Sequence, residues 1–459
     1  MIQELKWDNH PVLGNLLLNF TKPNGDLYNT IVLAGENGCG KTTVLSTLST
    51  FLNLGSFEPF SLIRYFVDGA RQKIYKDVTH HSNAQMGFHI RKDEQSGQEL
   101  SIHTNRNNSP DNIRSDKMDI RHYGCVFSKA RSGFSTNKIK STTTLQLDSD
   151  RYDDDSKDDF TSIKQLLIDI DSQDNSEWMD VTRNNKGESY EAFSKRAKST
   201  RFRDAFNSFF ENIKFEKVDA NNLSEKKIVF KKHGKQIDID SMSTGEKQIV
   251  FRGTQLLRNS NNLSGGTILI DEPELSMHPK WQRKALSFYR GLFTYNDVQN
   301  VQMILATHSE YIIKSALDDS DNVLVIVLKN DNGAIVPMRI TVPTALPSIS
   351  SAEVNYNAFG VLSTDYHIQL YGYLQSKENK TTIKDCDNYI MQSSFYNPLI
   401  HSKPSTNPHG TQYSTLPTYI RNAIDHPDSG NSFTEDELKK SIELLIELCN
   451  NANSAGLTH

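Results

Sequence analysis

The sequence predicts an α/β fold, because at three places an apolar strand runs directly into a polar loop. Residues 31–34 are followed by Gly35-Glu-Asn-Gly-Cys-Gly-Lys-Thr42 and then by a helix-compatible segment. Two later apolar strands, residues 267–270 and 302–306, end in an acidic turn and in a histidine-containing loop. A glycine-rich loop between a strand and a helix is the context that a phosphate-binding loop requires.

Length and composition limit the class of protein. At 459 residues the chain is long enough for two or three packed units. Its net charge is −5, so no global basic field is available to hold nucleic acid and any such contact would be local. No run of about 18 apolar residues predicts a membrane span. The first 15 residues lack the basic and apolar regions of a secretory signal, so we expect a cytoplasmic protein.

The cysteines are scattered and form no CxxC pair, which argues against both a zinc ribbon and a disulfide framework. They are Cys39, Cys125, Cys386 and Cys449.

Residues 1–55 are predicted to form a first lobe. Two short strands, residues 4–7 and 16–20, lead into the strand that carries the glycine-rich loop. After the loop, residues 43–54 have the apolar spacing of a helix, and Gly55 ends it.

The loop has the residue types that phosphate binding needs. Its glycines allow backbone N–H groups to curl around an oxyanion, Lys41 adds a point charge for the outer phosphates, and the Thr42 hydroxyl can ligate Mg²⁺. We expect the following loop residues to contact the nucleotide: Gly35, Asn37, Gly38, Cys39, Gly40, Lys41, Thr42 and Thr43.

Residues 56–238 are predicted to be a long, mainly helical insertion between two halves of one nucleotide-binding fold. Short strands are expected at residues 86–91, 99–104 and 123–128, and helices within residues 160–215. Residues 148–159 carry a dense acidic run. We interpret this run as an exposed or disordered loop rather than a metal site, because charge blocks of this kind repel one another and are solvated.

The second lobe, residues 239–345, begins with Ser243-Thr-Gly-Glu-Lys-Gln248 at the start of a periodic helix. A hydroxyl from Ser243, a backbone N–H from Gly245 and a helix N-terminus then face one way, an arrangement that binds an anion. Glu246 follows Ser243 at the spacing of a capping box, so an ordinary N-capped helix explains the same residues equally well. Ser243, Gly245 and Glu246 are candidate nucleotide-binding residues, and both interpretations stay open.

The strand over residues 267–270 delivers two carboxylates at its C-terminal end. Asp271 is expected to hold Mg²⁺ through water, and Glu272 to orient and polarise an attacking water. The strand over residues 302–306 delivers His308, which can contact a terminal phosphate and the same water. We therefore predict Glu272, His308 and Lys41 as catalytic residues, and Thr42 and Asp271 as metal ligands.

Together the segments GENGCGKT, STGEKQ, ILIDEPE and ATHS resemble the core of ABC-type ATPases, in the soluble branch that holds chromosome-maintenance and overcoming-lysogenization-defect proteins. The resemblance implies ATP and Mg²⁺ as cofactors. It also implies a homodimer or higher homo-oligomer with composite sites, in which the signature loop of one protomer closes on the ATP of the other.

Carried over to this chain, the resemblance makes residues 35–42 the Walker A motif, residues 243–248 the signature, and Asp271 and Glu272 the Walker B pair. Residues 276–278 correspond to the D-loop and His308 to the switch histidine. The departure is the Q-loop, for which no convincing glutamine is present. Residues 126–131 stand in that place, and hydrolysis is expected to be slow or conditional.

The C-terminal part narrows the family. Residues 323–328 and 335–340 are expected to be two strands that complete the sheet. We do not expect a Toprim nuclease to follow, because no strand-end glutamate is present. Residues 346–459 are predicted to be a mainly helical region that binds a partner. Its segments 350–375 and 415–449, together with the N-terminal segment VLGNLLLNF and the glycine-rich loop, resemble the PtuA family of ATPase subunits. This family comes from Septu-type anti-phage systems and includes the related retron-associated ATPases.

This second resemblance covers most of the chain outside residues 56–238. It implies an ATPase that carries a separate, PtuB-like HNH nuclease subunit and licenses DNA cleavage according to its nucleotide state. No HNH constellation is apparent in the sequence, so the partner would supply the cutting.

Two other functions are compatible with the sequence. Arg421-Asn-Ala-Ile-Asp-His426 matches the RNxxxH pattern of HEPN ribonucleases, in which arginine and histidine act on an RNA phosphodiester. Pro427 directly after His426 breaks the helix on which such residues normally sit. The other alternative is a DNA-repair or chromosome-maintenance ATPase, although the insertion lacks the long heptad pattern that such proteins usually display.

Overall fold

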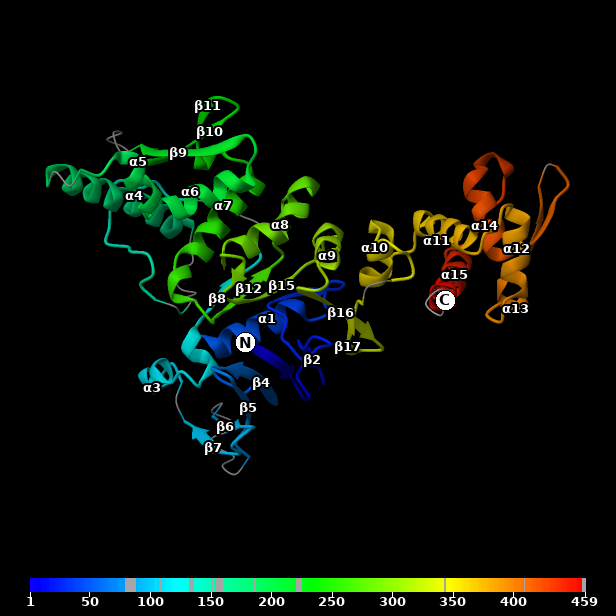
Figure 1. Ribbon diagram of the computed structural model, residues 1–459, viewed down its shortest axis with the longest axis horizontal. Helices are drawn as coiled ribbons and strands as arrows, with labels where there is room; N and C mark the ends of the chain where they lie inside the picture. Colours follow the sequence, from blue (N-terminus) through cyan, green and yellow to red (C-terminus); the bar gives the residue numbers. More distant parts are fainter. Residues whose placement is uncertain are drawn as a thin grey trace. The chain divides into compact units, whose positions relative to one another are not determined.

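The computed structural model divides into two compact units, Met1–Met338 and Arg339–His459 (Figure 1). The residues that it describes are 1–78, 88–103, 105–107, 109–131, 136–150, 152, 160–184, 187–219, 225–341, 344–407 and 409–455. The domain boundaries that we predict after residues 55, 238 and 345 stay predictions.

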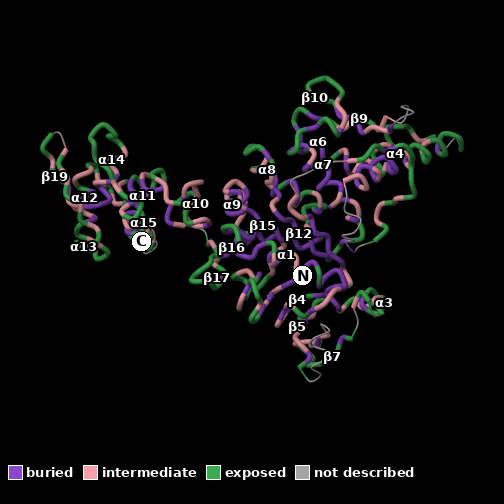
Figure 2. The backbone as a smooth tube through the Cα atoms, turned by 180° about the vertical axis from the view of Figure 1, so that it is seen from behind, coloured by how far each residue is buried: buried purple, intermediate pink, exposed green. Residues whose placement is uncertain are grey.

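A six-stranded sheet forms the centre of the first unit. The strands from β16 to β8 pair in parallel, and every residue of β3, β12 and β15 is buried (Figure 2). Because parallel strands end at the same edge, the loops that follow β3, β12 and β15 meet there. In spatial order the strands are β17 (Ala334–Arg339), β16 (Val323–Asp331), β3 (Thr30–Ala34), β15 (Gln302–Ala306), β12 (Thr267–Asp271) and β8 (Cys125–Ser128).

A second six-stranded sheet is antiparallel where its strand pairs are recorded. It joins the predicted N-terminal strands to strands from the segment that we expected to be an insertion. The sequence pattern missed this because pairing between β1 and β4 is a non-local choice. The strands are β2 (Leu17–Asn19), β1 (Ile2–Lys6), β4 (Leu62–Val67), β5 (Ala70–Lys76), β6 (His89–Asp93) and β7 (Glu99–Ile102). Residues 86, 87 and 104 of the predicted strands lie outside the described residues.

Helix α1 (Lys41–Leu52) packs in the core that the two sheets share. Its buried side chains include Val44, Leu45, Leu48 and Phe51, which recur at the spacing of one helix face. Fully burying each such side chain stabilises the fold by roughly 1.5–3 kcal/mol. The glycine-rich loop is thereby fixed at both ends, by β3 and by α1.

Another part of the first unit is a lobe in which helices pack beside a small antiparallel sheet. Figure 1 shows this lobe at one end of the unit and the sheet of β4 to β7 at the other. The sheet was not predicted, because its lysine-rich strands conceal the buried pair Ile228 and Phe230. The elements are α4 (Phe160–Arg183), α5 (Tyr190–Arg196), α6 (Thr200–Phe209), α7 (Thr244–Leu257), α8 (Pro279–Gly291), β9 (Ile213–Asp219), β10 (Lys227–Lys232) and β11 (Lys235–Asp238).

The predicted acidic loop over residues 148–159 lies mostly outside the described residues. Asp148, which is described, is held by Arg201 at 3.0 Å and by the backbone N–H of Asn261 at 3.1 Å. This end of the acidic run is therefore tied to the lobe.

The second unit is mainly helical, as predicted. Its core contains Tyr366, Leu370, Ile420 and Leu445, which come from α11, α14 and α15. The elements are α10 (Ser351–Phe359), α11 (Thr364–Lys377), α12 (Ile383–Gln392), α13 (Pro398–His401), α14 (Leu416–Asp425), α15 (Glu435–Ala455), β18 (Ser402–Thr406) and β19 (Gln412–Thr415). Across the described ranges of both units, no helix has the length and apolar character needed to cross a membrane. All four cysteines are buried.

Candidate functional site

The first turn of α1 and the end of β12 meet through a direct contact between side chains. The Thr42 hydroxyl, in the first turn of α1, donates to the carboxylate of Asp271 at 3.0 Å from Oδ2 and 3.2 Å from Oδ1. Asp271 is the last residue of β12 and is buried. A hydroxyl and a carboxylate side by side are hard oxygen donors, which is the ligand type that Mg²⁺ prefers. The two residues predicted to ligate a metal therefore lie together and fit one chemically.

The glycine-rich loop curls tightly around the end of Lys41. The Lys41 Nζ donates to the backbone oxygens of Gly35 and Glu36 at 2.8 Å each, and it lies 3.5 Å from the Cys39 Sγ. Burial lowers the pKa of Lys41 from its ordinary value. Gly35 has φ +136°, and a Cβ there would lie 2.3 Å from the oxygen of Leu328. The loop can therefore follow this path only with glycine at its first position.

Glu272 and His308 face each other across neighbouring strand ends. The His308 Nε2 lies 3.8 Å from the Glu272 Oε1, and both side chains are about one third exposed (30% and 32%). Glu272 adopts a left-handed backbone with φ +44°, and its N–H donates to the oxygen of Ala306 at 2.9 Å. A non-glycine residue in this conformation is uncommon and often marks a functional position.

Burial shifts the pKa values of two side chains at this edge of the sheet. It raises the pKa of Asp271, against the hydrogen bond from Thr42, and it lowers the pKa of His308, with the charge of Lys41 acting in the same direction. His308 is therefore held toward the neutral form, which can both donate and accept a hydrogen bond.

Glu274 is a site residue that sequence analysis did not single out. Its Oε1 accepts from the backbone N–H of His308 at 2.6 Å, whereas its Oε2 is buried and has no partner in the described part of the chain. Burial raises the pKa of this carboxyl group. In the sequence, Glu274 is the last acidic residue of Asp-Glu-Pro-Glu, and nothing in this motif indicates that its partner is His308.

Two further missed residues come from α7, and both bind the backbone of the catalytic edge. Arg252 donates to the oxygen of Asp271 at 2.8 Å and to the oxygen of Lys129 at 3.0 Å. Gln248 donates to the oxygen of Pro273 at 3.0 Å. Because residues four apart lie on one face of a helix, α7 holds the turn after β12 at two points.

The signature segment forms the capping box that we left as an open alternative. Ser243 Oγ accepts from the N–H of Glu246 at 3.4 Å, and the Ser243 N–H donates to the Glu246 carboxylate at 2.9 Å. Lys232 pairs with Glu246 at 2.6 Å. A Cβ at Gly245 would lie 2.5 Å from the oxygen of Ser276, so this glycine allows α7 to pack closely on the turn before α8.

Within the described residues of one chain, no recorded hydrogen bond or ion pair joins Ser243, Gly245 or Glu246 to residues 35–42. The structure thus brings together the glycine-rich loop, Asp271, Glu272 and His308, and it does not add the signature residues to that group.

Residues 126–131, which stand in the place of a Q-loop, include most of β8, the edge strand of the central sheet, and the residues after it. Ser128 pairs with Ile270 in the parallel ladder between β8 and β12. The Ser128 hydroxyl donates to the side chain of Gln255 at 3.2 Å, and Arg252 binds the oxygen of Lys129. This segment therefore lies beside the strand that carries Asp271.

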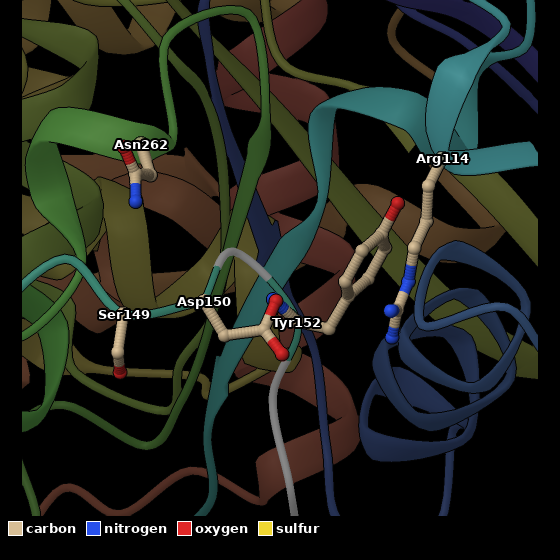
Figure 3. Close-up of a pocket in the computed structure, with 5 residues that line it drawn as sticks. All are labelled: Arg114, Ser149, Asp150, Tyr152 and Asn262. Carbon is tan, nitrogen blue, oxygen red and sulfur yellow. The ribbon is translucent and has the colours of Figure 1, made fainter. Parts of the chain in front are cut away.

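A polar pocket of about 340 Å³ occurs elsewhere in the first unit (Figure 3). Arg114 lies over the ring of Tyr152, 5.2 Å from its centroid, and the Tyr152 hydroxyl donates to the oxygen of Arg121. None of the predicted site residues lines it. Its lining residues are Arg114, Ser149, Asp150, Tyr152 and Asn262.

In the second unit, Arg421 and His426 belong to the end of α14. Arg421 pairs with Asp425 at 2.6 Å and also donates to Asn422. His426 is the C-cap of α14 and is exposed, as the proline after it led us to expect. The arginine of the RNxxxH pattern is thus engaged in a local helix-end ion pair.

A parallel sheet with a glycine-rich loop after one strand, and with Asp271 and Glu272 after another, defines the class of P-loop ATPase domains. The chain belongs to the family described as AAA domain, putative AbiEii toxin, Type IV TA system, whose model matches residues 31–314.

The chain is also a distant homologue of curated ATPases. It is 24% identical over 349 residues to the Septu protein PtuA of Bacillus thuringiensis, an alignment that covers 69% of this chain and 74% of that one. It is 32% identical over 145 residues to the Retron Ec83 probable ATPase of Escherichia coli. It is 30% identical over 102 residues to the Retron Vc95 probable ATPase of Vibrio cholerae serotype O1 biovar El Tor. The alignments span only 23% and 19% of these two retron proteins.

Among solved structures, the chain is similar to heads of SMC proteins. The Smc head bound to the C-winged helix domain of ScpA is 13% identical, with a TM-score of 0.39 over 74% of this chain and 98% of that one. The SMC head domain from Thermotoga maritima is 11% identical, with a TM-score of 0.35 over 74% and 99% of the two chains.

Proposed function

We propose that this chain binds and hydrolyses ATP with Mg²⁺, and that it thereby controls a separate nuclease in an anti-phage defence complex. The observation that carries the ATPase is the contact between Thr42 and Asp271. It places the hydroxyl of the glycine-rich loop and the carboxylate of the second strand where one cation would meet both.

The residues have separable roles in this proposal. The backbone N–H groups of residues 35–42 and the Lys41 ammonium hold the phosphates, and Thr42 and Asp271 hold the Mg²⁺, which neutralises phosphate charge when bound. Glu272 orients the attacking water and accepts its proton, and neutral His308 positions the same water and the terminal phosphate. The absence of a Q-loop glutamine makes this hydrolysis slow or dependent on assembly.

The second half of the site comes from another protomer. Ser243 is exposed at the first turn of α7, where the N-terminal N–H groups attract an anion. Because Ser243 does not join the glycine-rich loop of its own chain, a homodimer or higher homo-oligomer with composite ATP sites accounts for both sets of residues.

The partner docks on the second unit. A cluster of large apolar side chains is exposed around α13, and Leu399 is 95% exposed. Its other members are Met391, Phe395 and Ile400, which are 40%, 37% and 44% exposed. Contiguous exposed apolar side chains mark interaction sites. This cluster supports a protein partner docked on the second unit, and with the likeness to the Septu protein PtuA the partner in this proposal is a PtuB-like HNH nuclease that cuts DNA according to the nucleotide state.

The two alternative functions gain no support. Arg421 is engaged with Asp425, so the HEPN ribonuclease would have to break that pair. No observation favours a DNA-repair or chromosome-maintenance role over the defence role.

The test is to express the chain with its neighbouring open reading frame and to purify it through a tag on this chain. Plasmid DNA and total RNA are then assayed for cleavage with and without ATP. We expect a small HNH protein to co-purify and DNA to be cut in an ATP-dependent way.

Lys41→Ala should weaken ATP binding by about tenfold to a hundredfold, the value of a hydrogen bond to a charged group. Leu399→Asp should lose the partner and keep the ATPase.

Two outcomes would reject the proposal. Unchanged nucleotide affinity in Lys41→Ala, with Lys314→Ala as the control at a half-buried lysine, would reject the ATP site. RNA degradation by the chain alone that Arg421→Ala stops would show that the second unit is itself the effector.

A further inference from the structure

The loop that carries His308 is attached at two places to the segment that follows Glu272, once in the turn after β12 and once in α8. The backbone N–H of His308 donates to the Glu274 Oε1 at 2.6 Å. The hydroxyl of the next residue, Ser309, donates to the Gln282 Oε1 in α8 at 2.6 Å. The histidine loop is thus fastened to the chain that follows Glu272, as well as to its own strand.

Glu274 makes the attachment nearest to the chemistry. It reaches the backbone of the very residue whose imidazole lies 3.8 Å from the Glu272 carboxylate. Glu272 itself is bound to the end of β15 through the oxygen of Ala306. One bond runs from the Glu272 backbone to Ala306, and the other runs from the His308 backbone to Glu274. Together they fix the distance between the strand ends that carry Glu272 and His308.

We propose that Glu274 is a positioning residue for ATP hydrolysis, which sets the place of the His308 imidazole relative to Glu272 by holding the His308 backbone. This inference rests on the proposed ATPase function and adds a residue to it. A backbone shift of about 1 Å at a catalytic group costs up to about a hundredfold in rate.

The surroundings show that Glu274 is not a simple packing residue. Its Oε2 is buried without a partner in the described part of the chain, and the nearby Tyr289 hydroxyl is likewise buried and unpartnered. A buried polar atom without a partner costs stability. The bond that its other oxygen makes to His308 links this buried side chain to the catalytic edge.

The experiment compares variants of the full-length chain under single-turnover conditions, with the protein in excess over ATP and at concentrations above the Kd for ATP. Glu274→Ala removes the acceptor, whereas Glu274→Gln keeps an oxygen that can accept from the His308 N–H. We expect Glu274→Ala to lower the rate constant of hydrolysis by about tenfold to a hundredfold. We expect an unchanged Kd for ATP, and Glu274→Gln to restore most of the rate.

A double-mutant cycle with His308 separates positioning from general stability. If Glu274 acts through His308, adding Glu274→Ala to His308→Ala lowers the rate no further. The matched control is Glu353→Gln in the second unit, where a glutamate also has a buried, unpartnered Oε2. This variant should leave the hydrolysis rate as it is in the parent chain.

The outcomes are distinguishable from those that test the proposed function. A parent chain that does not hydrolyse ATP rejects the ATPase, and this inference falls with it. A parent chain that hydrolyses ATP, with an equally active Glu274→Ala or with rate losses that multiply in the double variant, overturns only the role of Glu274.

Discussion

The Thr42 hydroxyl donates to both carboxylate oxygens of Asp271, across 229 positions of sequence. This bond joins the start of α1 to the end of β12. The glycine-rich loop and the acidic strand end therefore meet at the same place. Its neighbour Glu272 is then the acid that faces the open side of the sheet edge, opposite His308.

Glu272→Gln should separate binding from hydrolysis. The amide keeps the size of the side chain but cannot accept a proton, so we expect ATP to bind with an affinity near that of the parent. Hydrolysis should fall by about a hundredfold to ten-thousandfold, the contribution of a general base. Calorimetry and phosphate release measure the two effects, and light scattering should detect an ATP-dependent dimer. Loss of ATP binding would contradict the role assigned to Glu272.

Ser243 variants test the capping and signature interpretations against each other. Ser243→Ala removes the cap of α7 and should lower the free energy of unfolding by about 1 kcal/mol. Ser243→Asp keeps a good cap, so the fold should keep its stability. Its negative charge would repel the phosphate of a second protomer, so in a Glu272→Gln background the ATP-dependent dimer should be lost. An intact dimer would leave Ser243 only its structural role.

Gly245→Ala should destabilise the first unit even without nucleotide. The new Cβ would lie 2.5 Å from the oxygen of Ser276, which is backbone and cannot move aside cheaply. Overpacking of this kind costs about 1–3 kcal/mol. Gly291→Ala is the control, because nothing lies within 4 Å of its Cβ position in α8. The control should be neutral or stabilising, and chemical unfolding compares the two variants.

His367 should make the second unit sensitive to acid. Burial lowers the pKa of this histidine to about 3 from 6.5, so between these values the unfolded chain binds a proton that the folded chain does not. The free energy of unfolding therefore falls as the pH is lowered from about 6.5 toward 3, by at most about 1.4 kcal/mol per pH unit from this group.

Replacing His367 should remove that slope. In His367→Gln, unfolding of the second unit measured between pH 5 and 7 should depend less on pH than in the parent. The exposed His409→Gln serves as the control and should retain the slope of the parent. Equal slopes in all three proteins would contradict the buried neutral histidine.

The sequence was most informative where a short segment determines its own structure. The strand, loop and helix around Lys41 and the acid-bearing strand of Asp271 each have a local pattern, and all of them were predicted at nearly the observed places. The histidine loop after β15 followed from the same logic. Parallel strands then placed Lys41, Asp271 and His308 together without further information.

Contacts between distant segments could not be predicted in this way. The link from Glu274 to His308 spans 34 positions, and the link from Arg252 to Lys129 spans 123. Nothing in either segment specifies the other. The same limit concealed the pairing of β1 with β4 and the lysine-rich sheet of β9 to β11, whose surface charge masks its short apolar faces.

Helix α7 connects Ser243 to Arg252, which lie about 14 Å apart along the helix axis at a rise of 1.5 Å per residue. The N-terminal end of the helix is exposed at Ser243. Farther along the same helix, Arg252 donates to the carbonyl groups of Asp271 and Lys129. A surface that contacts Ser243 therefore contacts the helix that also holds the end of β12 and the segment after β8.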